Sequence, residues 1–398
     1  MRWHASSVKS RGGLRRAGLA RRWISEMIQV SFVFTMLCGC AESQEVVGLT
    51  PATRVGNVLG EGHLEGYMRA EKVRHFQFPF DHGPHPSYRS EWWYVTATLR
   101  NASGEEFGVQ FTQFRQALKP SGVHVSGWHS GQVYMAHLAV ADIERRRHRH
   151  ATRLSRAHPQ GAGVELKPSY RVYIEDWSLA GSVDEQVQLR LDAGDADFAL
   201  QLSLSQTQPI VLQGNQGLSA KGPEQASYYY SIPSLAVSGT ITLAGTEHTV
   251  SGKAWLDREW STSVLRSELN GWDWFALHLD NGDEAMLFQL RRNDCARSAY
   301  DQAIYLNQAE VRQDFTATDF SLTPTRFWQD DQAAKWPVAW TMDLSGRRLE
   351  VRALLDDQLM DVGLKYWEGM IGIWEQGQRI GSGYMELTGY DGADACGV

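Results

Sequence analysis

The chain has 398 residues, of which 42% are hydrophobic and 11% aromatic, and it carries a formal net charge of −7 at pH 7. A chain of this length can bury a sizeable core, and two domains fit it better than one. Its acidic balance makes it a poor partner for a phosphate backbone, so we expect no nucleic-acid binding. The 15 tryptophans suit either a core or the wall of a ligand site, because an indole buries a large area and still needs a partner for its N–H.

Residues 1–39 have the pattern of a targeting segment. A basic front precedes the apolar run Ile28–Leu37, which is too short to span a membrane. The run ends in Leu37-Cys38-Gly39-Cys40, which resembles the lipobox of bacterial lipoproteins, in which the cysteine is acylated. The resemblance implies that Cys40 is lipidated in the periplasm, and the Ala41 that follows favours the outer membrane. A plain cleaved signal peptide or an uncleaved anchor is the alternative.

Strand patterns begin after a short polar segment. Residues 40–72 are mostly small and polar and are expected to form a tether. From about residue 73 onward the chain alternates: between Trp92 and Leu99, aromatic residues and threonines alternate with a second set of side chains at a period of two. The turn signal Asn101–Gly104 follows, and then another alternating segment. No long amphipathic helix is predicted before residue 210.

The second half of the chain repeats the first. Four residues of the first strand recur 180 positions later: Trp92, Tyr94, Leu99 and Asn101 return as Trp272, Trp274, Leu279 and Asn281. We therefore predict two copies of one domain, residues 73–236 and residues 237–392, divided after a proline. Many strands joined by turns favour an all-β fold of two tandem antiparallel barrels or sandwiches, and a barrel could hold a ligand in its interior.

The stretch from Phe80 to Leu99 is expected to form the mouth of a cavity. It places His82 and His85 in a turn directly before a strand that begins with Glu91. The Gly-Pro pair between the histidines excludes a regular helix, so they lack the spacing of a helical zinc site and no metal is predicted.

Missing motifs disfavour several other chemistries. The chain has no Cys-x-x-Cys pair, and Cys295 and Cys396 could instead form a disulfide in an oxidising periplasm. No Gly-x-Ser-x-Gly elbow is present, which disfavours a serine hydrolase. No phosphate loop or dinucleotide glycine pattern is present either, so no cofactor is expected.

Five stretches match a known family in order: DHGPHPSYRSEWWYVTATL, PIVLQGNQGLSAKGPEQASYYYSIPSLAVSGT, GKAWLDREWS, GWDWFALHLDNGDEAMLFQL and YWEGMIGIWEQGQRIGSGYMELTGY. Over residues 76–390 the chain resembles the AttH-type secreted proteins, which are related to carotenoid 1,2-hydratase. The resemblance implies a pair of lipocalin-like β-barrels, in agreement with the duplication. Many members of the family are labelled secreted hydrolases. Some are companions of ABC transporters of the FtsX/LolE type, which makes such a permease an expected partner.

The hydratase branch adds water to an isolated double bond, which needs a protonated acid and π faces that stabilise a cation. The resemblance implies that its essential aspartate corresponds to Asp257, with Trp255 in place of the usual tyrosine. Its His-x-Trp pair would correspond to Tyr228 and Tyr230, a departure that argues against a carotenoid as the substrate. Asp257 is either a pocket acid or the partner of Arg258 or another arginine in a buried salt bridge that holds the two barrels in register.

Two functions compete on these grounds. The first is a lipid-anchored periplasmic protein that binds an apolar ligand, a lipid or a terpenoid, and serves a transporter. The second is a hydratase-, isomerase- or cyclase-type enzyme that uses Asp257 as the acid on an unsaturated apolar substrate. A scaffold with a filled interior is a third possibility. The residues expected to line the ligand site are His82, His85, Glu91, Trp92, Tyr94, Trp272, Trp274 and Glu259, and those expected around the acid are Asp257, Trp255 and either Tyr228 with Tyr230 or, on the opposite face, Tyr229.

Overall fold

The computed structural model describes residues 64–121, 130–262, 268–294, 296–344 and 346–390. The predicted targeting segment, Cys40, Cys295 and Cys396 lie outside these ranges, as does most of the predicted tether. Within them the only regular helix is the 3-10 turn η1 (Phe80–His82). None of the helical segments in the described ranges is long and apolar enough to cross a membrane.

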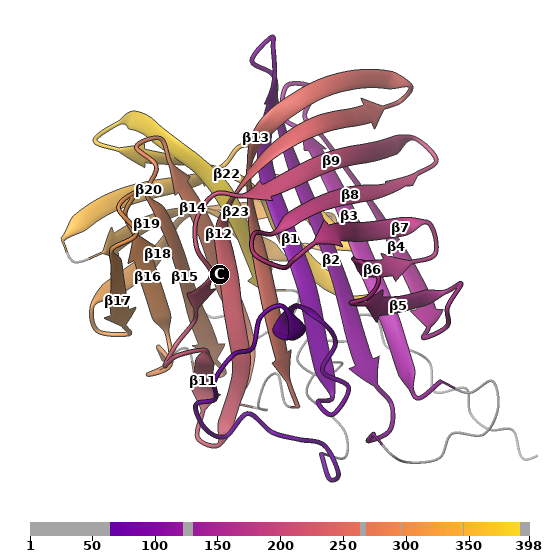
Figure 1. Ribbon diagram of the computed structural model, residues 1–398. Coiled ribbons are helices and arrows are strands. Elements are labelled where there is room, and N and C mark those ends of the chain that lie inside the picture. The colour runs from indigo at the N-terminus through magenta and orange to yellow at the C-terminus, as the bar shows by residue number, and fades with distance from the viewer. Residues whose placement is uncertain (1–63, 122–129, 263–267, 295, 345, 391–398) are drawn as a thin grey trace, which may run out of the picture. The chain divides into compact units, whose positions relative to one another are not determined.

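The first sheet is antiparallel throughout and is formed by the N-terminal strands of the described chain (Figure 1). Its strand order is β4-β3-β2-β1-β13-β12-β9-β8-β7-β6-β5, and β10 and β11 pair with β12. The strands are β1 (Ser90–Asn101), β2 (Glu106–Ala117), β3 (Gln132–Asp142), β4 (Arg147–Arg156), β5 (Ala162–Glu165), β6 (Tyr170–Ile174), β7 (Trp177–Ser182), β8 (Gln188–Asp195), β9 (Phe198–Gln206), β10 (Val211–Leu212), β11 (Leu218–Gly222), β12 (Gln225–Leu243) and β13 (Thr246–Ser261).

The second sheet follows the same plan with fewer strands. Its order is β17-β16-β15-β14-β23-β22-β20-β19-β18, and β21 pairs with β22. The strands are β14 (Leu269–Leu279), β15 (Glu284–Arg292), β16 (Gln302–Leu306), β17 (Arg312–Thr316), β18 (Phe320–Gln329), β19 (Lys335–Leu344), β20 (Arg347–Ala353), β21 (Leu359–Asp361), β22 (Lys365–Glu375) and β23 (Gln378–Thr388).

Both sheets place their first strand between their second strand and their last strand. β1 pairs with β2 and β13, and β14 pairs with β15 and β23. One sheet is a nearly closed barrel and the other a half-barrel. The prediction of an all-β fold with two tandem antiparallel barrels is confirmed, and the shared strand order agrees with the duplication seen in the sequence.

The division between the sheets differs from the predicted boundary between residues 236 and 237. That boundary falls inside β12, which pairs with β9 and β13 over residues on both sides of it. The sequence contains a proline at 233, but the strand absorbs it in an irregularity of register between Ile232 and Leu235 and continues. The first sheet therefore extends to Ser261, and the second begins at Leu269.

The alternation of β1 divides its side chains between two cores. Trp93, Val95 and Leu99 belong to the core of the first sheet. Tyr94 points the other way, into a separate apolar cluster that also contains Trp274 and Tyr384 of the second sheet. The two sheets therefore meet through a shared core, and this core surrounds the cavity described next.

Candidate functional site

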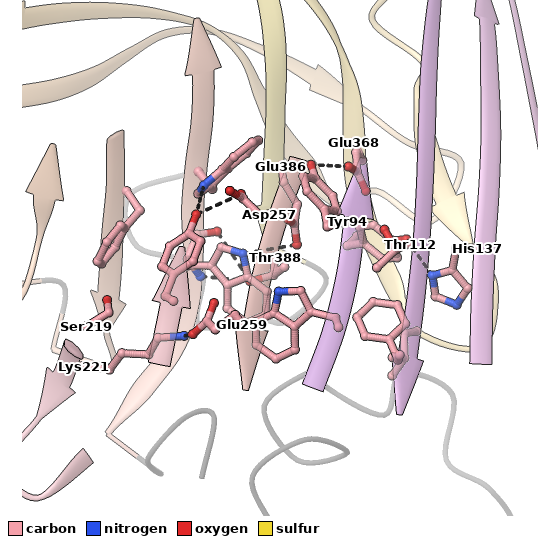
Figure 2. Close-up of a pocket in the computed structure, with 18 of the residues that line it drawn as sticks. Tyr94, Thr112, His137, Ser219, Lys221, Asp257, Glu259, Glu368, Glu386 and Thr388 are labelled. Carbon is pink, nitrogen blue, oxygen red and sulfur yellow. Dashed lines mark hydrogen bonds and ion pairs between the residues drawn. The ribbon is translucent and has the colours of Figure 1, made fainter. Parts of the chain in front are cut away.

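A cavity of about 100 Å³ lies where the two sheets meet, and mostly apolar side chains line it (Figure 2). Both sheets contribute to its wall. The lining residues are Trp92, Tyr94, Thr112, Phe114, Met135, His137, Ser219, Lys221, Tyr229, Asp257, Glu259, Trp272, Trp274, Phe288, Leu290, Leu364, Tyr366, Glu368, Glu386 and Thr388.

Asp257 is the first of the acidic groups in this wall. It lies on β13 with 3% of its surface exposed and accepts three hydrogen bonds, from Tyr229 Oη at 2.8 Å, Ser231 Oγ at 2.5 Å and Trp255 Nε1 at 2.7 Å. No arginine or lysine of the described ranges forms an ion pair with it. Burial raises the pKa of Asp257 to about 7, although the three hydrogen bonds oppose the shift. The group can therefore hold its proton near neutral pH.

The structure decides against a salt bridge between Asp257 and Arg258. The two are neighbours on one strand, so their side chains point to opposite faces. Arg258 donates to the carbonyl oxygen of Gly83 at 2.6 Å and pairs with Glu91 at 3.2 Å. Asp257 therefore faces the cavity, and no cationic side chain of the described residues pairs with it.

The second sheet places two more carboxyl groups in the same cavity. Glu386 on β23 accepts a hydrogen bond from Trp272 Nε1 at 3.2 Å, and Glu368 on β22 accepts one from Tyr94 Oη at 2.5 Å. Burial raises the pKa of Glu386 to about 8, and the nearby Asp257 adds to the shift. Burial and the neighbouring Glu386 raise the pKa of Glu368 well above its usual range.

Charge compensation is present at one point of the wall. Lys221 on β11 forms an ion pair with Glu259 and lies 5.5 Å from the centre of the Trp92 ring. The pair makes one polar edge of an otherwise apolar site.

His137 marks another polar point. Its Nδ1 is 2.6 Å from Tyr366 Oη, and burial lowers the pKa of the imidazole to about 3, so the ring is neutral. Its Nε2 is buried and has no hydrogen-bond partner among the described residues. His137 therefore brings an unsatisfied nitrogen into the wall of the cavity.

Six of the predicted site residues line the cavity, and a seventh supports it. Trp255 does not line the wall but donates its indole N–H to Asp257. The six residues in the wall are Trp92, Tyr94, Asp257, Glu259, Trp272 and Trp274.

Of the two arrangements predicted for the three adjacent tyrosines, the structure has the one in which the middle residue faces the cavity. Tyr229 lines the cavity, while Tyr228 and Tyr230 pack into the core of the first sheet. Tyr230 Oη lies 2.6 Å from His82 Nδ1, on the face of β12 that points away from the cavity. The assignment of Tyr228 and Tyr230 to the acid is therefore wrong.

The prediction that His82, His85 and Glu91 line the cavity is also wrong. Glu91 is fully buried between Arg115 and Arg258, and the nearby arginine charges hold its pKa below its usual range despite its burial. His85 Nδ1 lies 3.2 Å from Glu91, and its ring stacks on Trp260 at 3.7 Å. These contacts hold the turn before β1 against the interior of the barrel, so the three residues stabilise the fold.

Sequence reasoning missed Tyr229, Glu368 and Glu386 as definite members of the site. One sequence signal was available for Glu386, because Trp255-Leu256-Asp257 and Tyr384-Met385-Glu386 are the same aromatic-x-acid pattern near the end of each repeat. No comparable signal exists for Glu368, because its counterpart in the first repeat is a serine.

The chain matches a family model described as AttH-like over residues 69–390. The crystal structure of an AttH protein from Nitrosomonas europaea is 35% identical, with a TM-score of 0.73 over 81% of this chain and 99% of that one. The structure of kievitone hydratase from Nectria haematococca is similar in fold alone, at 14% identity and a TM-score of 0.61 over 81% of this chain and 95% of that one. No curated protein matches the sequence. With most of its length covered by the family model, the chain belongs to the AttH-like family.

Proposed function

We propose that this protein is an enzyme that transfers a proton to an apolar, unsaturated small molecule bound between the two sheets. The observation that carries the proposal is Asp257, a buried carboxyl group in a cavity walled by aromatic rings that has no cationic partner within the described part of the chain. A structural carboxylate at this depth would be expected to have a compensating charge, as Glu91 has. The reaction class is that of a hydratase, an isomerase or a cyclase.

The geometry supports proton transfer to carbon. Asp257 is held by Tyr229, Ser231 and Trp255, so its carboxyl group has a fixed orientation toward the cavity. Its raised pKa keeps a proton available near neutral pH. Protonation of a double bond leaves a cation on the neighbouring carbon, and aromatic faces stabilise such a cation by about 2 kcal/mol or more when water is excluded. Capture of the cation by water, loss of another proton or ring closure then decides the product.

A second candidate function is carriage of an apolar ligand without reaction. The apolar lining of the cavity favours it, and so does the lipobox-like sequence before Cys40. In this form the protein would be anchored by its lipid to the periplasmic face of the outer membrane. It would deliver a lipid or terpenoid to or from an ABC transporter permease.

The two functions differ in whether the ligand exchanges hydrogen with the solvent. The purified protein is incubated in D₂O with a panel of isoprenoid alkenes, including geraniol, β-ionone and squalene, and carbon-bound deuterium is measured by mass spectrometry. We expect wild type to introduce deuterium, and Asp257→Asn to do so at least about 10²-fold more slowly. Asp280→Asn, a change of an exposed carboxyl group, is the control.

Quenching of tryptophan fluorescence by each compound measures binding separately from reaction. Wild type and Asp257→Asn that bind a compound equally tightly and return it without deuterium would establish carriage and contradict the enzymatic proposal.

A further inference from the structure

The internal duplication places a second carboxyl group in the position that corresponds to Asp257. Tyr94 of β1 pairs with Asp257 of β13, and Trp274 of β14 pairs with Glu386 of β23. Tyr94 and Trp274 are equivalent residues of the two repeats, so Asp257 and Glu386 are equivalent as well. The residues two positions earlier, Trp255 and Tyr384, correspond in the same way, because their partners in the first strand of each sheet are also 180 positions apart.

The two equivalent groups share one cavity rather than belonging to two separate sites. Both line the same wall, and Figure 2 shows both side chains directed into the space between the sheets. The duplication has thus brought two copies of one acidic position together.

The surroundings of the two carboxyl groups have diverged. Across the ladder from Asp257 lies Ser231, whereas Glu368 lies across from Glu386. Asp257 accepts three hydrogen bonds, while the structure gives Glu386 one, from Trp272. The two groups therefore differ in how well their anions are stabilised, which is the condition for one to act as an acid and the other as a base.

Other groups in the wall indicate that the cavity is built to hold a ligand. Nε2 of His137 and Oγ of Ser219 are fully buried and have no hydrogen-bond partner among the described residues. Both residues line the cavity. Buried polar atoms are normally satisfied, so these two are placed to meet a polar group of a ligand or a bound water molecule.

The other charged groups in the wall do not neutralise Asp257 and Glu386. Lys221 is already paired with Glu259, and Glu368 adds another acid that accepts from Tyr94. Two buried carboxyl groups in one cavity repel each other when both are ionised, so loss of the first proton makes the second harder to remove.

We propose that Asp257 and Glu386 work as one acid–base pair, one group from each sheet, on a substrate bound between them. The inference rests on the proposed proton-transfer function and adds the group that completes the reaction. The protonated member gives its proton to one carbon of a double bond, and the π electrons of that bond form the new C–H bond.

The ionised member receives a proton in the second half of the reaction. In a hydration, water adds its oxygen to the cationic carbon and gives a proton to the ionised carboxylate, so that H and OH are both added to the substrate. In an isomerisation, the carboxylate removes a proton from the carbon next to the cation, and the electrons of that C–H bond form the new double bond. In both cases the pair ends with one proton, now on the other member, which returns by exchange with solvent before the next turnover.

Titration of the carboxyl groups tests the pair without a substrate. The protein is labelled with ¹³C at Asp Cγ and Glu Cδ, and wild type, Asp257→Asn and Glu386→Gln are followed by NMR between pH 4 and pH 10. In wild type we expect the resonance of each member to respond to the titration of the other. In each variant the remaining member should lose that response, and its titration should shift by at least about one pH unit below the upper step of wild type, although Glu386 still responds to the neighbouring Glu368. Glu247→Gln, an exposed change, is the control that should leave both steps in place.

Deuterium transfer separates failure of the pair from failure of the proposed function. With the alkene panel in D₂O, we expect Glu386→Gln to lower the rate at least about tenfold while the affinity for each compound stays the same. If the resonances of Asp257 and Glu386 in wild type each follow a single titration without responding to the other group, the pair is overturned. This test needs wild type alone, so it holds even if a variant does not fold. A Glu386→Gln variant that is as active as wild type while Asp257→Asn is inactive would also overturn the pair and leave the proposed function intact. A wild type that binds the panel without deuterium transfer would instead overturn the proposed function.

Discussion

At the scale of single residues, two buried carboxyl groups of the first sheet have opposite electrostatics. Glu91 lies between Arg115 and Arg258, and these charges lower its pKa. Asp257 lies on the other side of the sheet with hydroxyl and indole donors alone, and burial raises its pKa to about 7. The contrast follows from the alternation of a strand, which sends neighbouring side chains to a filled core and to a cavity.

The raised pKa predicts how Asp257 affects stability. The folded state binds this proton more tightly than the unfolded state, so the stabilisation is complete below the ordinary pKa of 3.8 and is lost as the pH rises toward 7. Between pH 5 and pH 8 we expect the unfolding free energy of wild type to fall by about 3 kcal/mol relative to that of Asp257→Asn. Urea denaturation of both proteins at the two pH values measures this difference.

As a control, the unfolding free energy of Asp280→Asn, a change of an exposed side chain, should differ from that of wild type by the same amount at pH 5 and pH 8. A difference between wild type and Asp257→Asn that does not change with pH would show that the carboxyl group is ionised throughout the range.

The sequence could predict Asp257 and the alternate aromatic residues of β1 and β14, because a repeated period of two shows which residues share a face. It could not show which face meets the cavity. Tyr229 was therefore left undecided against Tyr228 and Tyr230, and a shift of one position reverses every side chain of a strand. The role of His82 and His85 depends on where the turn before β1 packs, and local pattern does not contain that information.

At the scale of elements, the last strand of each repeat positions its acid by pairing with the first strand. Gly252 of β13 and Gly381 of β23 occupy equivalent positions in these ladders, opposite Leu99 and Leu279. A Cβ atom at Gly252 would overlap the carbonyl oxygen of Thr98, and one at Gly381 would overlap that of His278. The close approach of the strands therefore requires glycine at both positions.

Alanine at either glycine should separate the first strand from the last strand of its sheet. We expect Gly252→Ala and Gly381→Ala each to lower the unfolding free energy by roughly 1–3 kcal/mol, as overpacking does elsewhere. Urea denaturation measures the loss, and Ser251→Ala, at the exposed neighbour of Gly252, is the control. Variants as stable as wild type would mean that the ladders can shift to make room.

The elements themselves were largely predictable, since alternation and turn residues identify strands. The boundary between the repeats was not, because proline and a change of pattern usually end a strand. Here β12 continues past its proline through an irregularity of register, and its pairing with both β9 and β13 holds it in the first sheet. The end of the first repeat is therefore set by pairing between strands distant in sequence, which local sequence patterns do not reveal.

At the scale of the whole molecule, the proposed lipid anchor can be tested directly. Acyl chains contribute about 0.8 kcal/mol for each buried CH₂ group, so a lipidated Cys40 would hold the protein to a membrane. We expect wild type to sediment with the outer membrane and to be released by detergent, and Cys40→Ser to be found in the soluble fraction. Cell fractionation and the intact mass of the purified protein check both expectations. Membrane attachment of Cys40→Ser would indicate another anchor.

The equivalence of Asp257 and Glu386 also bears on whether a bound molecule would have a preferred orientation in the cavity. An ancestor made of two identical subunits would have shown a ligand the same acid from either side, so the ligand could have entered either way round with equal affinity. In a single chain with two repeats, each half can change alone. Serine at 231 and glutamate at 368 now make the two ends unlike, and a molecule with distinct ends can settle in a single direction.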